Sequence, residues 1–418
     1  MKRVQKNPRA EIVSIGEELL GEGLRGGNAE YLAGRLSRLG FRVRVKTTVG
    51  DDLDEIGAVL TRAVEKMDCV IATGGLGPTG DDQTLEAVTL AFQAPLRHSE
   101  SIYRRLLGKR QGGRPVMARA LRRQSRIPDG FVPLPNPHGT APGLIRKGKE
   151  GILVLLPGVP QEMKGIFEAS VHSRLARSFP ALRPNRSRVL KIVGVPEPRI
   201  DRLAIQAFRA EGQGIPTVLA GCGCVEVHLG QKGRAATRRI EIRMRGKLGI
   251  AVYGVDDDTL AEVVGRLLRQ GRQSLAVAES CTGGMLGEMI TSVPGASRYF
   301  FGGVIAYGKR AKLEMLTIRE DDLRRHGAVS SRLAAAMAKQ SRLRFSASLG
   351  LGITGIAGPG GGSRRHPLGE VFIGLSWKEG ARAVRYRFRG AREPIRRRAC
   401  VAALDLVRRR LILHPGKG

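Results

Sequence analysis

A serine between an apolar run and a helix-like segment is the chemically most informative feature of the sequence. Residues 274–288 are SLAVAESCTGGMLGE, in which Ser280 follows the apolar run and small residues follow Ser280. A strand, a tight turn and a helix in this order direct backbone N–H groups and a hydroxyl to one point, where negative charge is stabilised. We therefore predict that this turn presents a nucleophile to an acyl or phosphate-bearing substrate.

Lysine, and not histidine, is the residue type available to activate this serine. The segment YGKRAK, residues 307–312, lies further along the chain and contains no histidine. Lys312 can accept a proton near neutral pH only if burial or nearby positive charge lowers its pKa. Because Ser280 and Lys312 are too far apart in sequence to share one helix face, tertiary folding must bring them together. The two residues together predict a hydrolase with a serine nucleophile and a lysine base.

Two glycine-rich segments are expected to bind the substrate and its developing negative charge. The candidate residues in these segments are Thr282, Gly283, Gly284, Thr354, Gly355 and Gly358. Two alternatives stay open at this point. Cys281 is chemically a better nucleophile, although no histidine lies near it in sequence. A small-residue turn at the end of a strand also often serves only close packing.

A third glycine-rich segment, residues 73–82 with the sequence TGGLGPTGDD, lies between a predicted strand and a predicted helix. Its glycines, Gly74, Gly75 and Gly77, would let a phosphate approach the backbone. The adjacent Asp81 and Asp82 could hold Mg²⁺ or a similar cation that bridges a diphosphate. The alternative is that these aspartates only cap the helix that begins at Gln83.

Composition limits the number of domains and indicates the cellular compartment and the kind of partner. At 418 residues the chain is long enough for two to four domains, and no apolar run reaches the roughly 20 residues of a membrane helix. Five scattered cysteines predict no disulfide framework and a reducing cytoplasm. The formal charge of +33 suits a nucleic-acid partner, but the basic residues are spread along the chain and only 4% of residues are aromatic. A generally basic surface is therefore the favoured interpretation.

The order of apolar and polar segments predicts an α/β protein with three domains. Strand and helix patterns alternate from residue 10, which is typical of a parallel sheet covered by helices. Residues 172–255 are Arg-rich and are expected to form a small α+β domain, in which Gly249 ends a helix. A second α/β domain begins at residue 258. The predicted domains are 10–171, 172–255 and 258–412.

Residues 258–412 resemble the C-terminal domain of CinA-type proteins. The matching blocks are AESCTGG, PGAS, FFGGVIAYGKRAK, GAVS, GITGIAGPGGG and HPLGEV. That domain is similar to nicotinamide-nucleotide amidase, so the resemblance implies hydrolysis of the carboxamide of nicotinamide mononucleotide without a cofactor. It also implies that Ser280 and Lys312 are catalytic and that Tyr307 serves as a proton relay or ring contact, with Thr282 beside them. The chain departs from the family pattern at Gly308-Lys309 and at His366.

The resemblance further implies a phosphate clamp near the C-terminus. The segment FRGAREPIRRRA is similar to the phosphate-side segment of the family and makes Arg392, Arg396 and Arg397 candidates. The alternative is that these arginines form a solvated helix face.

Residues 10–170 resemble the N-terminal half of the CinA family, which shares the fold of MoaB/Mog-like molybdopterin-binding proteins. The matching blocks are IVSIGEELLGEGLRGGNAEYLAGRL, VGDD, TGGLGPTGDDQT, NPHGTAPG and LPGVPQEM. This resemblance implies a metal-dependent ADP-ribose pyrophosphatase, with Asn28 and Thr79 among its binding residues. Glu17 and Gly26-Gly27 depart from the pattern, and residues 172–255 resemble the KH-like connecting domain of the family only loosely.

The expected protein is a homodimeric cytoplasmic enzyme of pyridine-nucleotide salvage that acts on small nucleotides. One alternative is a nucleotide- or molybdopterin-binding protein without catalysis. A second is a basic accessory factor in DNA competence or recombination.

Overall fold

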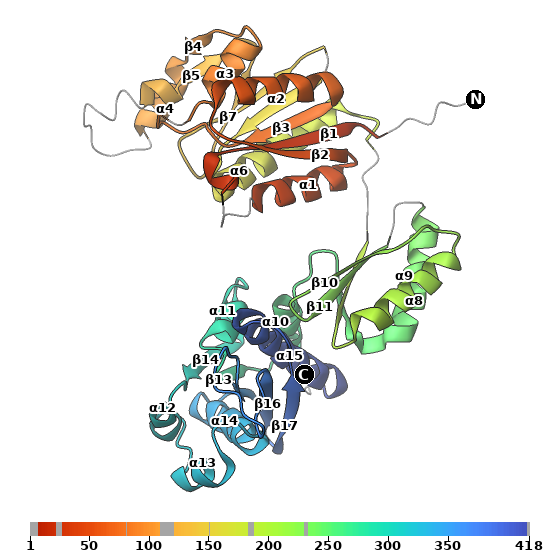
Figure 1. Ribbon diagram of the computed structural model, residues 1–418, viewed down its shortest axis with the longest axis vertical. Helices are drawn as coiled ribbons and strands as arrows, with labels where there is room; N and C mark the ends of the chain where they lie inside the picture. Colours follow the sequence, from red (N-terminus) through yellow and green to blue (C-terminus); the bar gives the residue numbers. More distant parts are fainter. Residues whose placement is uncertain are drawn as a thin grey trace. The chain divides into compact units, whose positions relative to one another are not determined.

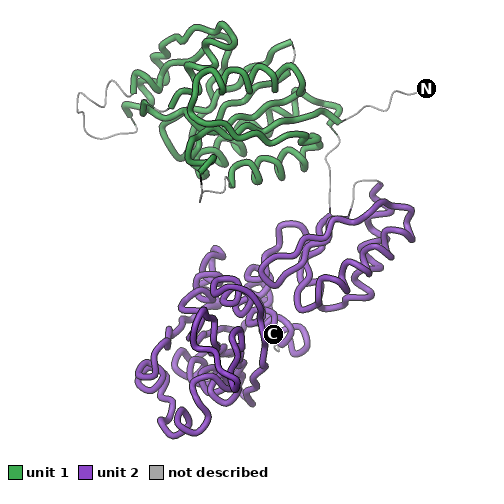
Figure 2. The backbone as a smooth tube through the Cα atoms, in the orientation of Figure 1, with its two compact units in different colours: residues 1–186 green, residues 187–418 purple. Residues whose placement is uncertain are grey.

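The computed structural model describes residues 7–21, 27–80, 82–108, 121–149, 151–182, 188–229 and 233–415. The chain forms two compact units, residues 1–186 and 187–418 (Figure 2). The first unit continues past residue 171 because helix α7 (His172–Ser178) buries Leu175 in its core. The predicted middle and C-terminal domains lie together in the second unit.

The first unit is a six-stranded sheet with helices on both faces (Figure 1). Its four parallel strands, in sheet order, are β2 (Arg42–Val49), β1 (Arg9–Ile15), β3 (Cys69–Thr73) and β8 (Ile152–Leu156). The antiparallel strands β7 (Gly143–Lys147) and β6 (Val132–Leu134) complete the sheet. The apolar strands β1, β3 and β8 are almost wholly buried, as expected for strands covered on both faces, whereas the edge strand β2 is mostly exposed.

The helices of the first unit follow the predicted alternation. They are α1 (Gly27–Leu39), α2 (Leu53–Lys66), α3 (Thr84–Ala91), α4 (Glu100–Gly108) and α6 (Pro160–Ile166). Two short strands, β4 (Leu96–His98) and β5 (Arg126–Pro128), pair apart from the main sheet. Separate apolar clusters lie on its two faces, one containing Leu32 and Leu36 of α1 and the other Ile56 and Leu60 of α2. The glycine-rich loop after β3 therefore lies at the carboxyl edge of the parallel strands.

The second unit begins with a four-stranded antiparallel sheet. Its strands, in sheet order, are β10 (Thr217–Gly221), β11 (Cys224–His228), β9 (Val189–Val193) and β12 (Val252–Val255). Helices α8 (Glu197–Arg209) and α9 (Arg234–Leu248) bury apolar residues against this sheet. Gly249 ends α9 with a φ of 52°, which confirms the predicted helix end.

A five-stranded sheet forms the rest of the second unit (Figure 1). Its strands, in sheet order, are β14 (Phe300–Ile305), β13 (Leu275–Glu279), β15 (Leu349–Gly355), β16 (Glu370–Trp377) and β17 (Gly380–Arg387). Strand β13, which lies between β14 and β15, is parallel to both of its neighbours. Its carboxyl end therefore opens at the edge of the sheet where Ser280 follows.

Helices cover both faces of this sheet. On one face lie α10 (Leu260–Gln270), α11 (Met285–Thr291) and α15 (Arg392–Leu413), and on the other lie α12 (Lys309–Glu314), α13 (Glu320–His326) and α14 (Ser331–Arg344). Glycines let α14 approach closely, because a Cβ on Gly350 would lie 2.1 Å from the Ala338 carbonyl oxygen. Among the described residues, no helix is long and apolar enough to cross a membrane.

Contacts between β9 and the helices that cover the second sheet hold residues 187–418 together as one compact unit. Val193 at the end of β9 belongs to the same apolar cluster as the α10 and α15 residues. A Cβ on the next residue, Gly194, would lie 3.0 Å from the Arg409 guanidinium of α15. Arg409 in turn donates a 2.7 Å hydrogen bond to the buried Asp405.

Candidate active site

The fold brings the predicted nucleophile and base into contact. Ser280 directly follows strand β13, and Lys312 lies on α12, which follows the neighbouring strand β14. The Lys312 Nζ lies 3.1 Å from the Ser280 Oγ. Both residues are buried, with 3% of Lys312 and 8% of Ser280 exposed. The predicted pairing of these two residues is therefore present in the structure.

The environment of Lys312 favours the neutral amine. Burial lowers the pKa of Lys312, and the described residues give it no ion pair. Its Nζ lies 2.8 Å from the Ala306 carbonyl oxygen and 2.9 Å from the Tyr307 carbonyl oxygen. A neutral amine has two N–H donors and one lone pair. If the two donors serve these carbonyls, the lone pair is directed at the Ser280 hydroxyl, as a general base requires.

The turn after Ser280 uses its backbone donors differently from the prediction. The Gly283 N–H donates to the Ser280 carbonyl oxygen at 3.1 Å, and the Gly284 N–H donates to the Glu279 carboxylate at 3.0 Å. The two glycines therefore do not supply the free donors that the sequence predicted. Their φ angles of 58° and 94° show why glycine occupies both positions. Among the described residues, the N–H groups of Cys281 and Thr282 have no acceptor.

Cys281 has the properties of a packing residue. Its side chain is buried in the cluster that includes the α15 residues. Burial raises the pKa of the Cys281 thiol to about 11, so the thiolate is scarce at neutral pH. Ser280 is therefore the better candidate for the nucleophile.

The second glycine-rich loop is tied to the site by an arginine. Arg392 donates one hydrogen bond to the Gly358 carbonyl oxygen and another, at 2.7 Å, to the Tyr307 hydroxyl. The Thr354 hydroxyl donates to the Ala328 carbonyl oxygen at 2.5 Å. A Cβ on Gly355 would lie 2.5 Å from the Glu370 carbonyl oxygen, so this glycine serves close packing. The structure thus brings Tyr307, Gly358 and Arg392 together.

The other two candidate arginines differ in their contacts. Arg396 donates a 2.6 Å hydrogen bond to the Thr282 carbonyl oxygen, whereas Arg397 pairs with Glu393 at 2.8 Å. Both the Arg396 Nε and the Thr282 Oγ1 are buried without a partner among the described residues. Arg396 and Thr282 therefore retain donor capacity beside Ser280, while Arg397 is committed to its own helix.

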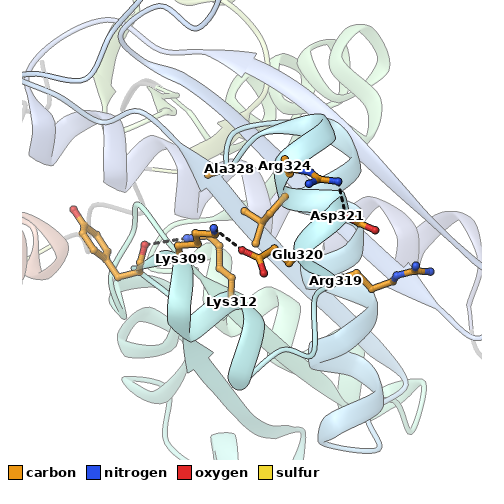
Figure 3. Close-up of a pocket in the computed structure, with 9 residues that line it drawn as sticks. Lys309, Lys312, Arg319, Glu320, Asp321, Arg324 and Ala328 are labelled. Carbon is orange, nitrogen blue, oxygen red and sulfur yellow. Dashed lines mark hydrogen bonds and ion pairs between the residues drawn. The ribbon is translucent and has the colours of Figure 1, made fainter.

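A cavity of about 1000 Å³ adjoins Lys312. Figure 3 shows its lining residues, which are Tyr307, Lys309, Lys312, Arg319, Glu320, Asp321, Leu323, Arg324 and Ala328. Two of the cations have partners, because Lys309 contacts Glu320 at 2.8 Å and Arg324 contacts Asp321 at 3.1 Å. Arg319 has no ion pair with any described residue. Sequence reasoning missed Arg319, since nothing in an Arg-rich chain distinguishes it.

The N-terminal candidates gather in a cavity of about 530 Å³. Its lining includes Asn28, Gly74, Gly75, Gly77 and Asp82 but not Thr79. The Asn28 side-chain nitrogen donates to the Gly158 carbonyl oxygen at 2.7 Å. The Asn28 Oδ1 is buried and has no partner among the described residues. Asn28 therefore offers an unused acceptor at the carboxyl edge of the sheet.

Asp82 stabilises the glycine-rich loop through hydrogen bonds. Its carboxylate accepts hydrogen bonds from the Gly77 N–H at 2.7 Å, from the Thr79 N–H at 2.9 Å and from the Thr79 hydroxyl. The hydrogen-bond partners of this carboxylate are Gly77 and Thr79 and not an N–H group of α3, so among the described residues Asp82 does not cap that helix. Asp81, the other predicted ligand, lies outside the described residues.

The described residues do not fit a preformed divalent-metal site. No group of three or more His, Cys, Asp or Glu side chains among them could hold a metal ion. Asp82, the described member of the predicted pair, already accepts three hydrogen bonds from its own loop. Metal binding at this end of the protein stays a prediction.

Comparison with known proteins identifies both halves of the chain. Residues 257–411 match the family described as CinA C-terminal domain, and residues 11–177 match the probable molybdopterin binding domain. The protein CinA of Thermoplasma acidophilum, whose crystal structure is described as having unknown function, is 34% identical. That likeness covers 40% of this chain and 98% of the other, with a TM-score of 0.37.

Two bacterial relatives match along nearly the whole chain. A CinA-like protein of Thermosynechococcus vestitus is 39% identical over 417 residues, which is 97% of this chain and 100% of the relative. A putative competence-damage inducible protein of Caldicellulosiruptor bescii is 37% identical over 96% of this chain and 99% of its own length. The chain therefore belongs to the CinA family.

Proposed function

We propose that the C-terminal half hydrolyses the carboxamide of nicotinamide mononucleotide to nicotinate mononucleotide and ammonia. The observation that carries the proposal is the 3.1 Å contact between Ser280 and a buried Lys312 that has no ion pair among the described residues. A serine hydroxyl needs such a base because it is a weak nucleophile when protonated. The choice of substrate rests on the resemblance of the motif blocks to nicotinamide-nucleotide amidase.

In the first half of the reaction, the Ser280 Oγ attacks the carboxamide carbon and Lys312 takes the hydroxyl proton. The negative charge that develops on the carboxamide oxygen is stabilised by the N–H groups of Cys281 and Thr282, whose donors are unused by the described residues. Lys312 then gives its proton to the departing nitrogen, so that the C–N bond breaks and ammonia leaves. The product is an ester of Ser280.

In the second half, water attacks the ester carbon and Lys312 takes a proton from it. The Ser280 oxygen leaves and recovers the proton from Lys312, which restores the starting enzyme. The net reaction consumes one water for each ammonia and carboxylic acid formed. No cofactor is required by this sequence of proton transfers.

The cavity beyond Lys312 receives the rest of the substrate in this proposal. Its wall contains Tyr307, Lys309 and Arg319. Arg319, which has no ion pair among the described residues, is suited to the substrate phosphate because guanidinium groups bind phosphate through charge-assisted hydrogen bonds. Arg392 and Arg396 contact backbone carbonyls at the site, so they support its loops, and Arg396 also keeps a donor for substrate.

The test is ammonia release by the purified full-length protein. Nicotinamide mononucleotide, nicotinamide riboside and free nicotinamide are compared at equal concentrations, with Ser280→Ala as the background control. The proposal expects release that depends on Ser280 and is fastest with the mononucleotide. Release that persists in Ser280→Ala, or none from the mononucleotide by folded wild-type protein, contradicts it.

A second proposal concerns the N-terminal cavity, for which one observation favours a nucleotide ligand. The unpartnered Asn28 Oδ1 and the loop glycines line the same cavity, so a donor and a phosphate could bind side by side. We propose ADP-ribose as this ligand and, following the family resemblance, as a substrate for pyrophosphate cleavage. Calorimetry with ADP-ribose and wild-type protein tests binding, with Asn28→Ala expected to weaken it. Equal binding by the two proteins contradicts the proposed site.

A further inference from the structure

Glu279 is a buried acid beside the proposed nucleophile that the reaction steps above do not use. It is the last residue of β13 and directly precedes Ser280, and only 1% of it is exposed. Its carboxylate accepts three backbone hydrogen bonds. The donors are the N–H groups of Gly284 at 3.0 Å, Leu286 at 3.1 Å and Gly287 at 2.8 Å.

These donors would otherwise attract an anion to the start of α11. The first N–H groups of a helix have no partner within the helix, and a buried carboxylate needs hydrogen bonds to offset its lost hydration. Glu279 and the start of α11 therefore satisfy each other. The negative charge of Glu279 is stabilised by amides, and Lys312 is not required as its partner.

The same contacts define which donors remain for the substrate. With the Gly284 N–H bound to Glu279 and the Gly283 N–H bound to the Ser280 carbonyl, the backbone N–H groups of this turn that have no acceptor among the described residues are those of Cys281 and Thr282. Two further contacts hold the turn, because the Ser280 N–H donates to the Ile353 carbonyl at 3.0 Å and Arg396 binds the Thr282 carbonyl. The turn is thus fixed on both sides of its two free N–H groups.

We propose that Glu279 is a positioning residue for amide hydrolysis. It holds the turn closed through α11, so that the Ser280 hydroxyl faces Lys312 and the N–H groups of Cys281 and Thr282 face the carboxamide oxygen. This inference rests on the proposed amidase function. In this proposal the Glu279 carboxylate holds the nucleophile in position and takes no part in substrate binding or proton transfer.

The experiment compares Glu279→Gln with Glu288→Gln in the full-length protein. Glutamine keeps the size of Glu279 but replaces one acceptor oxygen by an NH₂ group that cannot accept an N–H bond. Glu288 is exposed on α11, the helix whose N–H groups Glu279 accepts, so its variant is the control for loss of one negative charge near the turn. Two quantities are measured: kcat and KM for ammonia release per titrated active site, and the rate at which a fluorophosphonate probe labels Ser280.

A displaced nucleophile slows the chemical step more than substrate binding, and misplacement by about 1 Å can cost on the order of 10²-fold in rate. We expect Glu279→Gln to lower kcat and the labelling rate by about 10²-fold on this basis, with KM nearly unchanged. The pH dependence of kcat/KM should keep the wild-type position, because Lys312 stays the base. Glu288→Gln should match the wild type in every measurement.

Several results would overturn the proposal. The first is a Glu279→Gln variant with wild-type kcat per active site, and the second is a Glu288→Gln variant that loses as much kcat as Glu279→Gln. The third is a shift in the pH dependence of kcat/KM in Glu279→Gln, which would mean that Glu279 acts electrostatically on Lys312. If Glu279→Gln does not fold, Glu279→Asp keeps the charge but shortens its reach, and a wild-type labelling rate in that variant also overturns the proposal. The labelling rate distinguishes a failure of the Glu279 proposal from a failure of the amidase proposal. If the wild type labels at Ser280 but releases no ammonia, the amidase function fails while the role of Glu279 is still decided by labelling.

Discussion

Replacing Lys312 tests the proposed mechanism most directly. Lys312 is the group within hydrogen-bonding distance of the Ser280 hydroxyl among the described side chains. General-base catalysis contributes about 10²- to 10⁴-fold to a rate. We therefore expect Lys312→Met to lower kcat for ammonia release by about 10³-fold or more, with a smaller change in KM. Arg310→Met, which removes an exposed cation of the same helix outside the cavity lining, is the control and should keep most of kcat.

Lys312→Arg separates a base from a structural cation. Arginine retains donors for the Ala306 and Tyr307 carbonyls but stays protonated at neutral pH, so it cannot take the serine proton. We expect this variant to be as inactive as Lys312→Met. A Lys312→Arg enzyme with substantial activity would refute the role of Lys312 as base.

The pH dependence provides the quantitative check on this reasoning. Burial lowers the pKa of Lys312 below its ordinary value of 10.5. The wild-type kcat/KM should therefore rise about tenfold per pH unit below the pKa of the folded protein and become flat above it. Stability should follow the same group. Between the lowered pKa and 10.5 the unfolded chain binds more protons, so the free energy of unfolding rises with pH through that window. Denaturant titrations at several pH values should show this contribution in the wild type and its absence in Lys312→Met.

Three other predictions concern the remaining site residues. Ser280→Ala should lose several orders of magnitude in kcat, and Ser280→Ala/Lys312→Ala should be little worse because the two groups act as a unit. Cys281→Ala should retain most activity. An inactive Cys281→Ala beside an active Ser280→Ala in the ammonia assay would indicate a thiolate nucleophile instead. Arg319→Ala should raise KM for nicotinamide mononucleotide about tenfold or more, because a hydrogen bond to a charged group contributes about 1.5–3 kcal/mol. The KM for nicotinamide riboside should stay unchanged. An equal rise in Arg325→Ala, the exposed control on α13, would argue against a phosphate site. Asp82→Asn should destabilise the first unit by about 1–3 kcal/mol through its unsatisfied loop donors without changing ammonia release.

The local pattern of the sequence was sufficient to predict the main elements. The apolar runs after residues 9, 68 and 274 are buried strands, and helix α2 follows the predicted alternation of strands and helices. These predictions succeed because side-chain periodicity and helix caps are local properties. The position of Ser280 at the end of a strand was predicted in the same way.

The tertiary structure decided which polar groups meet and which remain unused. Lys312 contacts Ser280 only because β14 lies beside β13, while Arg392 and Arg396 reach the site because the first turns of α15 pack near it. Gly283 and Gly284 were predicted as free donors, but Ser280 and Glu279 accept their hydrogen bonds. Residue types and spacing determine which groups can donate or accept a hydrogen bond. The partner of each group depends on which segments the fold places within about 3 Å, and a one-dimensional pattern does not contain that distance.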